Sequence, residues 1–334
     1  MPFNGWTASL NARDILGMLD AQYYKGVFPE NEESLYTLAE RVLQEAKLPK
    51  YRNGHPRWIL DDSLWKITTK APLPSCSMAE CLQLIASAGC CSMFFDREGR
   101  LHMEPLKDTY TDGEYMIVDE DHSYSKAEIN TAKQIKRFDV SYYDYTGEGE
   151  PGTFTTTLEL SSGNNEIFNE FPDLYKDAEV VVTVNGEPVK ESEAKNGVTL
   201  RSQEIYAKSC SLVIYSEGEE KAEVKLTVNG KVIKPVEFIN NIANNVNGEI
   251  LSFKNNTLIT SKAHTYAVGE WLKENMNRRM KYSLDLRVDP SLETGDIFKI
   301  VDDAGKEKTI LVTSSGFSFN GAFKGKYEGV AIDG

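Results

Sequence analysis

A strand, a break and a second strand near the C-terminus constrain the fold of this chain most. Tyr282, Leu284 and Leu286 alternate with polar residues, the period of a half-buried strand. Asp289-Pro290 then interrupts this strand, because proline lacks a backbone N–H and keeps the preceding residue extended. An apolar run at 297–301 begins the next strand. The pattern predicts that the chain ends in a sheet with a sharp corner.

The first third of the chain predicts helices and one hairpin. Apolar residues keep helical spacing at about 11–23, 33–47 and 77–89. Short alternating runs at 91–96 and 100–104, joined by a turn through a glycine, predict a hairpin. This part is therefore a mixed α/β region.

The middle of the chain is rich in strands and contains a repeat. Segments 178–190 and 222–234 both place Asn-Gly between β-branched residues, at Asn185-Gly186 and Asn229-Gly230. Asn-Gly predicts a type I′ hairpin turn, since that turn needs positive φ at both central residues. A solenoid needs about three copies or more, so two copies predict paired hairpins in one small domain.

Three of these segments resemble the baseplate hub proteins of phage tails. The strongest match is the C-terminal strand, corner and strand after a Trp-bearing helix. Its residues are Arg287, Asp289, Pro290, Leu292, Glu293, Gly295 and Asp296, followed by Phe317, Phe319, Asn320 and Gly321. The hairpin at 91–104, with its Asp-Arg-x-Gly-x-Leu pattern, is the second match, and the first helix is the third.

The resemblance implies an α+β, multidomain fold with four parts. We expect residues 1–10 to be the end of a missing N-terminal barrel, and 11–133 to form a mixed α/β domain. Residues 134–248 form the β-rich hairpin domain, and 249–334 a helix with a small β-barrel-like domain. Because Trp6–Leu10 reads as a strand without an earlier partner, we expect a shortened member of the family.

The same resemblance implies a structural role without catalytic residues or cofactors. Copies of a hub form a homotrimeric ring that caps the tail tube and lets DNA pass, located in the virion tail after assembly in the host cytoplasm. Lacking one barrel, this chain should be monomeric or weakly associated in dilute solution. Its partners are expected to be itself and other tail proteins.

The charge of the chain argues against nucleic-acid and membrane binding. The formal net charge is −14, which opposes stable contact with phosphates or an anionic bilayer. Neither a long apolar span nor a signal peptide is recognisable. The five cysteines have no disulfide-framework spacing and are typical of reduced thiols.

The cysteines and histidines raise two possibilities, a metal site and a Cys/His nucleophile, and the sequence argues against both. No zinc motif occurs, and the histidines are scattered at 55, 102, 122 and 264. Cys90 and Cys91 point to opposite sides if both are extended. Cys91 and His102 lie on the two arms of the predicted hairpin and could approach each other, but a buried thiol is more often a small hydrophobe.

The remaining charged groups allow only general alternatives. A glycosidase needs a pair of carboxylates, but adjacent acidic residues such as Asp61/Asp62 and Asp119/Glu120/Asp121 are expected by chance in a chain with 51 aspartates and glutamates. Lys273, Arg278, Arg279 and Lys281 suit the C-terminal end of a helix. A tail-associated cell-wall hydrolase or peptidase stays open as an alternative, as does a carbohydrate-binding tail-tip module.

Overall fold

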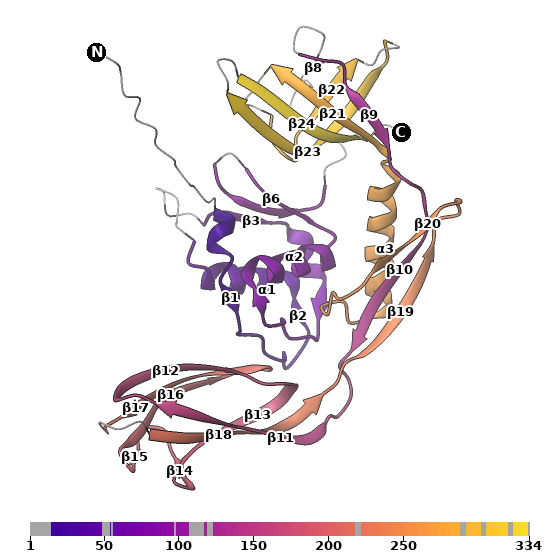
Figure 1. Ribbon diagram of the computed structural model, residues 1–334. Coiled ribbons are helices and arrows are strands. Elements are labelled where there is room, and N and C mark those ends of the chain that lie inside the picture. Colours follow the sequence, from indigo (N-terminus) through magenta and orange to yellow (C-terminus); the bar gives the residue numbers. More distant parts are fainter. Residues whose placement is uncertain are drawn as a thin grey trace, which may run out of the picture.

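The structure is a computed structural model with three hydrophobic cores arranged along an extended body (Figure 1). It describes residues 15–48, 54, 56–96, 98–106, 117–118, 123–217, 222–287, 292–301, 305–319 and 323–332. A helical unit occupies the centre, a β-sandwich lies at one end and a twisted sheet at the other. Within the described part of the chain, no helix is long and apolar enough to cross a membrane.

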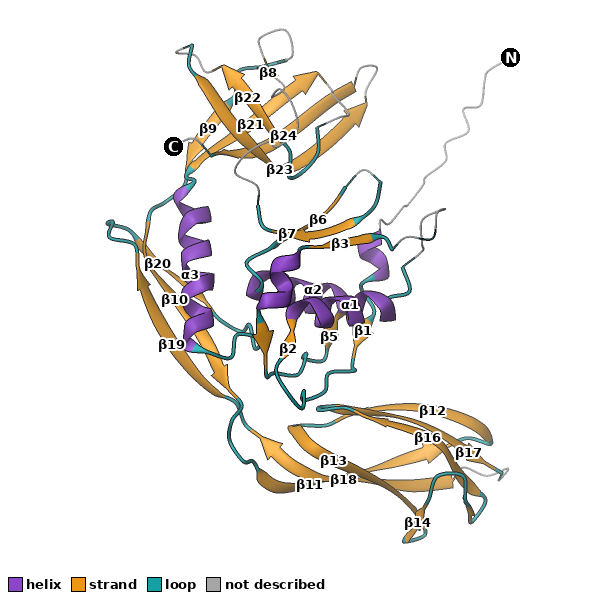
Figure 2. Ribbon diagram, turned by 180° about the vertical axis from the view of Figure 1, so that it is seen from behind, coloured by secondary structure: helices purple, strands orange, loops and turns teal. Residues whose placement is uncertain are grey.

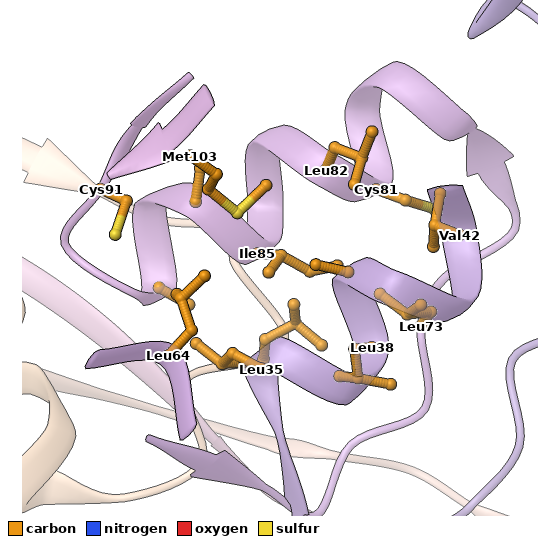
Figure 3. Packing of buried hydrophobic residues seen from close by; sticks show 14 of the residues in the cluster. Leu35, Leu38, Val42, Leu64, Leu73, Cys81, Leu82, Ile85, Cys91 and Met103 are labelled. Atoms are coloured by element: carbon orange, nitrogen blue, oxygen red, sulfur yellow. The ribbon is translucent and has the colours of Figure 1, made fainter. Parts of the chain in front are cut away.

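The first core is built around two short helices, α1 (Leu35–Glu45) and α2 (Met78–Ala88). Ser34 caps α1 by accepting from the Thr37 N–H at 3.1 Å, and Ser77 and Glu80 form a reciprocal capping box on α2. The apolar faces of the two helices pack against each other in this core. Figure 3 shows its buried side chains, among them Leu38 of α1, Ile85 of α2 and Met103 from a later strand. Each such buried side chain contributes about 1.5–3 kcal/mol.

Short extended and 3-10 segments surround these helices. They are η1 (Ile15–Met18), β1 (Gln22–Tyr23), β2 (Glu33–Ser34), β3 (Trp58–Leu60), η2 (Asp62–Lys66), β4 (Thr68–Thr69), β5 (Cys76–Ser77), β6 (Ser92–Phe95) and β7 (Leu101–Glu104). The predicted hairpin is β6–β7, and β3 joins it in parallel with β7.

The helix predicted at about 11–23 is wrong after residue 18. Among the described residues it is one 3-10 turn, and the chain then extends into β1, which pairs with β5. The carbonyls of Leu19 and Ala21 accept from the N–H groups of Ala79 and Met78 at the start of α2. These tertiary hydrogen bonds replace the ones a continued helix would make.

A three-stranded sheet and the longest helix complete the first core. The sheet has the order β19 (Val236–Ala243), β10 (Ile135–Asp144), β20 (Glu249–Phe253), and α3 (Lys262–Asn277) covers one face (Figure 2). The Asn240 amide donates to Thr265 at 2.8 Å, and Gly269 leaves room for Ile242. The sequence assigned α3 to the terminal domain, whereas its buried residues belong to the core shared with α1 and α2.

The β-sandwich is an insertion between two paired strands. Asp144 at the end of β10 pairs with Val236 at the start of β19, and Glu150 pairs with Val232 where the sandwich begins. Its sheets have the orders β11-β18-β13-β14 and β12-β17-β16-β15. The strands are β11 (Glu150–Leu160), β12 (Gly163–Glu170), β13 (Leu174–Val184), β14 (Glu187–Val189), β15 (Ala194–Lys195), β16 (Val198–Ile205), β17 (Ser209–Ser216) and β18 (Ala222–Ile233).

Contacts with the first unit hold the sandwich in place. The Ala207 N–H donates to the Gly26 carbonyl at 2.8 Å, and the Ser209 hydroxyl donates to the Tyr24 carbonyl at 2.9 Å. The Tyr24 and Phe168 rings also meet. The sandwich is therefore joined to the body both by its two connecting strands and by one of its faces.

The terminal unit is a six-stranded sheet of order β8-β22-β23-β24-β21-β9. Its strands are β8 (Ile117–Val118), β9 (Glu128–Thr131), β21 (Met280–Arg287), β22 (Ile297–Val301), β23 (Glu307–Phe319) and β24 (Phe323–Ala331). The sequence predicted a barrel-like domain, but the described strands form an open sheet with β8 and β9 at its ends. Those two strands belong to the region 11–133, which the sequence assigned to a separate domain. In the structure β8 pairs with β22 and β9 pairs with β21.

Candidate functional site

The corner between β21 and β22 carries the hub-like motif. The Glu293 N–H donates to the Asp296 carboxylate at 2.7 Å, which closes the turn. Gly295 has φ +94°, a conformation that favours glycine, and its N–H donates to the Val312 carbonyl at 2.9 Å. Leu292 is buried in the third core. Asp289 and Pro290 lie outside the described residues.

Arg287 ends β21 beside an aromatic ring. Its guanidinium carbon lies 5.8 Å from the centre of the Tyr124 ring, and the Lys324 nitrogen lies 5.4 Å from the same centre. Arg287 and Lys324 face each other across β21 and β24. The later part of the motif continues along β23, where Phe317 is exposed and packs edge-on against Tyr327. Asn320 and Gly321 fall beyond the described part of the chain.

The corner contacts the hairpin that forms the second hub-like motif. A Cβ placed on Gly295 would lie 3.1 Å from the tip of the Phe94 ring on β6. Phe94 stacks in turn on His102 of β7, with ring centres 5.0 Å apart. Figures 1 and 2 both show the β6–β7 hairpin between the helices and the terminal sheet. Two motifs that are far apart in sequence therefore meet in space, and we call this contact the joint.

Charged groups surround His102 at the joint. Its Nε2 lies 3.0 Å from the Asp96 carboxylate, and its Nδ1 lies 3.6 Å from the Glu104 carboxylate. Glu104 and Asp96 together raise the pKa of His102 against the opposing effect of burial. Burial raises the pKa of Asp96, but hydrogen bonds from the Arg100 backbone and from His102 outweigh it and lower the pKa. The protonated imidazole is thus stabilised on the hairpin.

This arrangement predicts a pH dependence of hairpin stability. Because the folded-state pKa of His102 is raised, its contribution is fully present below the unfolded-state pKa of about 6.5 and is lost as the pH rises through the folded value. We expect amide exchange of β6 and β7 to increase relative to α1 when the pH rises from 5.5 to 8, after correction for intrinsic exchange. His102→Gln should remove most of this increase. An equal increase in both proteins would contradict the assignment.

His264 is the matched control for this measurement. Its Nε2 donates to the Ala88 carbonyl at 2.7 Å, and burial lowers its pKa. The contribution of His264 is therefore present above the unfolded-state pKa and is lost as the pH falls through its lowered value. The two histidines act in opposite directions, so His264→Gln should leave the rise in hairpin exchange above neutral pH unchanged.

The Cys/His pair considered from sequence is not assembled. His102 pairs with Phe94 across the hairpin, whereas Cys91 precedes β6 and contacts the Gly89 carbonyl. Burial raises the pKa of Cys91 to about 12, which keeps it a thiol. A nucleophilic role of this pair is not supported by the geometry.

The other charged candidates have local structural partners. Asp61 caps η2 by accepting from the Ser63 N–H at 2.8 Å. Lys273 pairs with Glu270, Arg278 with Glu274, and Arg279 donates to the Ala132 carbonyl. Within the described ranges, no three His, Cys, Asp or Glu residues are grouped to hold a metal. The acidic run 119–121, His55 and His122 lie outside those ranges.

The two Asn-Gly pairs have different structures. Asn185 and Gly186 have φ +51° and +81° and form the tight turn between β13 and β14. The same prediction for Asn229-Gly230 is wrong, because both residues lie inside β18 and pair with Thr153 and Gly152 of β11. Gly230 is needed for space instead, since an added Cβ would lie 3.1 Å from the Lys176 carbonyl at a bulge of β13.

Gly186 gives a direct test of the turn. A Cβ there meets nothing within 4 Å, so Gly186→Ala carries the cost of positive φ alone. We expect a loss of about 1–2 kcal/mol in the stability of the sandwich, measured by urea unfolding. Gly186→Asn should lose less, since Asn tolerates this conformation. Equal stability of the Ala variant and the wild type would contradict the turn geometry.

Several solved structures are similar to this chain, and three of them are tail proteins of phage or prophage origin or tail proteins of bacteria. Neither a known family model nor a curated protein matches the chain. The 43 kDa tail protein of prophage MuSo2 from Shewanella oneidensis has 11% identity and a TM-score of 0.46, with 96% of this chain and 71% of that chain covered. A tail protein from Neisseria meningitidis MC58 has 7% identity, a TM-score of 0.45 and coverage of 95% and 72%.

The third similar structure is prophage tail protein gp18 from Listeria monocytogenes EGD-e. It has 6% identity and a TM-score of 0.42, and the match covers 95% of this chain and 69% of that chain. All three TM-scores are below 0.5.

A cavity lies where the sandwich meets the first unit. It has a volume of about 410 Å³ and is lined by Phe28, Tyr175 and Tyr206 together with Glu30 and Asp177. The Tyr206 hydroxyl donates a hydrogen bond to the Glu204 carboxylate. Two aromatic side chains of the sandwich, Tyr175 and Tyr206, thus line this cavity, whereas the Asn185-Gly186 turn has Val184 and Glu187 as its sequence neighbours.

Proposed function

We propose that this chain is a structural component of a phage tail or of a prophage-derived tail-like particle, with a role similar to that of a baseplate hub. The observation that carries the proposal is the joint. Two segments that separately resemble hub motifs contact each other through Gly295 and Phe94. Chance resemblances in unrelated segments have no reason to be adjacent in the fold.

The proposed role is mechanical rather than catalytic. Copies of the chain form a homotrimeric ring with neighbouring tail proteins, cap the tail tube and open to let DNA pass. The sandwich, inserted through two adjacent strands, can be carried on the outside of such a ring without interrupting the first core. The proposed location is the virion tail.

The net charge of −14 suits a wall along which DNA slides. An acidic surface repels phosphates and so prevents stable binding. We expect no mobility shift of duplex DNA with the purified chain at physiological salt. A shift that weakens steeply with added salt would overturn this part of the proposal.

The proposal is tested by the composition of purified particles. After prophage induction or infection, tailed particles are separated on a density gradient and their proteins are quantified by mass spectrometry. The expected result is that the chain co-purifies with the major tail proteins at a fixed ratio across the particle peak. Recovery only in the soluble fractions would contradict a structural role. Zymography on peptidoglycan with the same chain tests the hydrolase alternative separately.

A further inference from the structure

Two cysteines of the first core face each other. Cys76 lies in β5 and Cys81 on the first turns of α2, and their sulfur atoms are 3.3 Å apart. Both are free thiols in this structure. A disulfide bond would need the sulfur atoms to approach by about 1.3 Å.

The backbone holds this pair from both sides. Cys76 pairs with Tyr23 of β1, and the capping box of Ser77 and Glu80 fixes the turn between the two cysteines. Cys81 is fully buried, whereas Cys76 is partly exposed. A soluble oxidant can therefore reach Cys76, and Cys81 lies behind it.

The local chemistry assigns different roles to the two sulfur atoms. The hydrogen bond from the Cys81 thiol lowers the pKa of Cys76. That same hydrogen bond, together with burial, raises the pKa of Cys81. Cys76 also lies at the N-terminus of α2, where the helix dipole favours an anion. The thiolate is the reactive nucleophile in thiol chemistry, so Cys76 attacks first and Cys81 second.

We propose that Cys76 and Cys81 form a thiol–disulfide site that reacts with hydrogen peroxide. The Cys76 thiolate attacks one peroxide oxygen, so that an S–O bond forms, the O–O bond breaks and the leaving hydroxide takes a proton to become water. The Cys81 sulfur then attacks the Cys76 sulfur. The S–O bond breaks, and the departing hydroxide leaves with the Cys81 proton as a second water. Two thiols lose two electrons in total, and the peroxide gains them.

The other three cysteines provide an internal comparison. Burial raises the pKa of Cys90 to about 11, of Cys91 to about 12 and of Cys210 to about 11. Cys90 and Cys91 are consecutive, and Cys210 belongs to the core of the sandwich. We expect Cys76 to be alkylated about tenfold faster than these three in the native reduced protein, because its thiolate is stabilised and accessible.

The experiment uses the full chain, reduced and then freed of reductant. Hydrogen peroxide is added and removed, remaining thiols are alkylated in denaturant, and the intact mass is measured. The expected product carries three alkyl groups instead of five and has lost two hydrogens. Trypsin leaves both cysteines in one peptide, whereas cleavage after Glu80 separates them unless the disulfide joins the fragments.

Variants locate the bond. Cys76→Ser should prevent the disulfide and, being partly exposed, should leave the circular dichroism spectrum unchanged. Cys210→Ser should oxidise as the wild type does. If Cys81→Ser impairs folding, Cys76→Ser alone decides the question. Five alkylated cysteines after peroxide treatment, over-oxidation of Cys76 without the bond, or fragments joined through Cys90 or Cys91 would each overturn the proposal.

Discussion

Phe138→Ala is expected to destabilise the central unit by about 3–5 kcal/mol, the usual cost of removing a buried phenylalanine ring. Phe138 lies on β10, is 0% exposed and belongs to the core that also contains α1, α2 and α3. The loss of its ring should therefore destabilise together the segments that precede and follow the sandwich in the sequence. Urea unfolding followed by tryptophan fluorescence measures this, because the four tryptophans, at 6, 58, 65 and 271, all lie outside the sandwich.

Phe171→Ala is the matched control for that variant. Phe171 is 2% exposed and packs edge-on against Tyr175 in the sandwich core. The same substitution should destabilise the sandwich, seen by calorimetry, and leave the tryptophan transition of the central unit nearly unchanged. Equal shifts of the tryptophan transition in both variants would show that the two cores unfold as one.

Gly295→Val is expected to open the joint. Backbone strain at φ +94° costs about 1–3 kcal/mol for a β-branched residue, and the new side chain meets Phe94. Hydrogen exchange should rise in the β6–β7 hairpin as well as at the corner itself. Gly305→Val is the control, because Gly305 has φ +73° with nothing within 4 Å of an added Cβ. Increased exchange of the hairpin in both variants would show that the Phe94 contact is unimportant.

Local sequence rules succeeded where the deciding interactions are local. The capping box of α2, the hairpin β6–β7 and the Asn185-Gly186 turn are each decided within a few residues. The Asp296 side chain closes the β21–β22 corner, as turn chemistry predicts for aspartate. These features need no knowledge of the remainder of the chain.

The same rules failed where distant segments compete for backbone hydrogen bonds. Asn229-Gly230 has the composition of a turn, but pairing with β11 keeps it extended. The first helix is cut short by hydrogen bonds to α2. The sequence placed a Trp-bearing helix before the terminal strands, but it did not show that this helix packs on β10 rather than on the terminal sheet.

Sequence reasoning missed the joint and the thiol pair. Phe94 and Gly295 are separated by most of the chain, and nothing in either segment names its partner. Cys76 and Cys81 are close in sequence, yet a helix start between them makes their distance depend on how β5 enters α2. The cysteine spacing with Ser77 and Glu80 between could have suggested the pair.

The central claim, a structural role in a tail, is tested most directly by deletion and complementation. The gene is removed from the phage or prophage, and particles are counted by negative-stain electron microscopy after induction. The proposal predicts that complete tailed particles disappear, that the wild-type gene in trans restores them, and that Gly295→Val restores fewer than Gly305→Val. Normal numbers of complete, infectious particles without the gene would contradict the proposal.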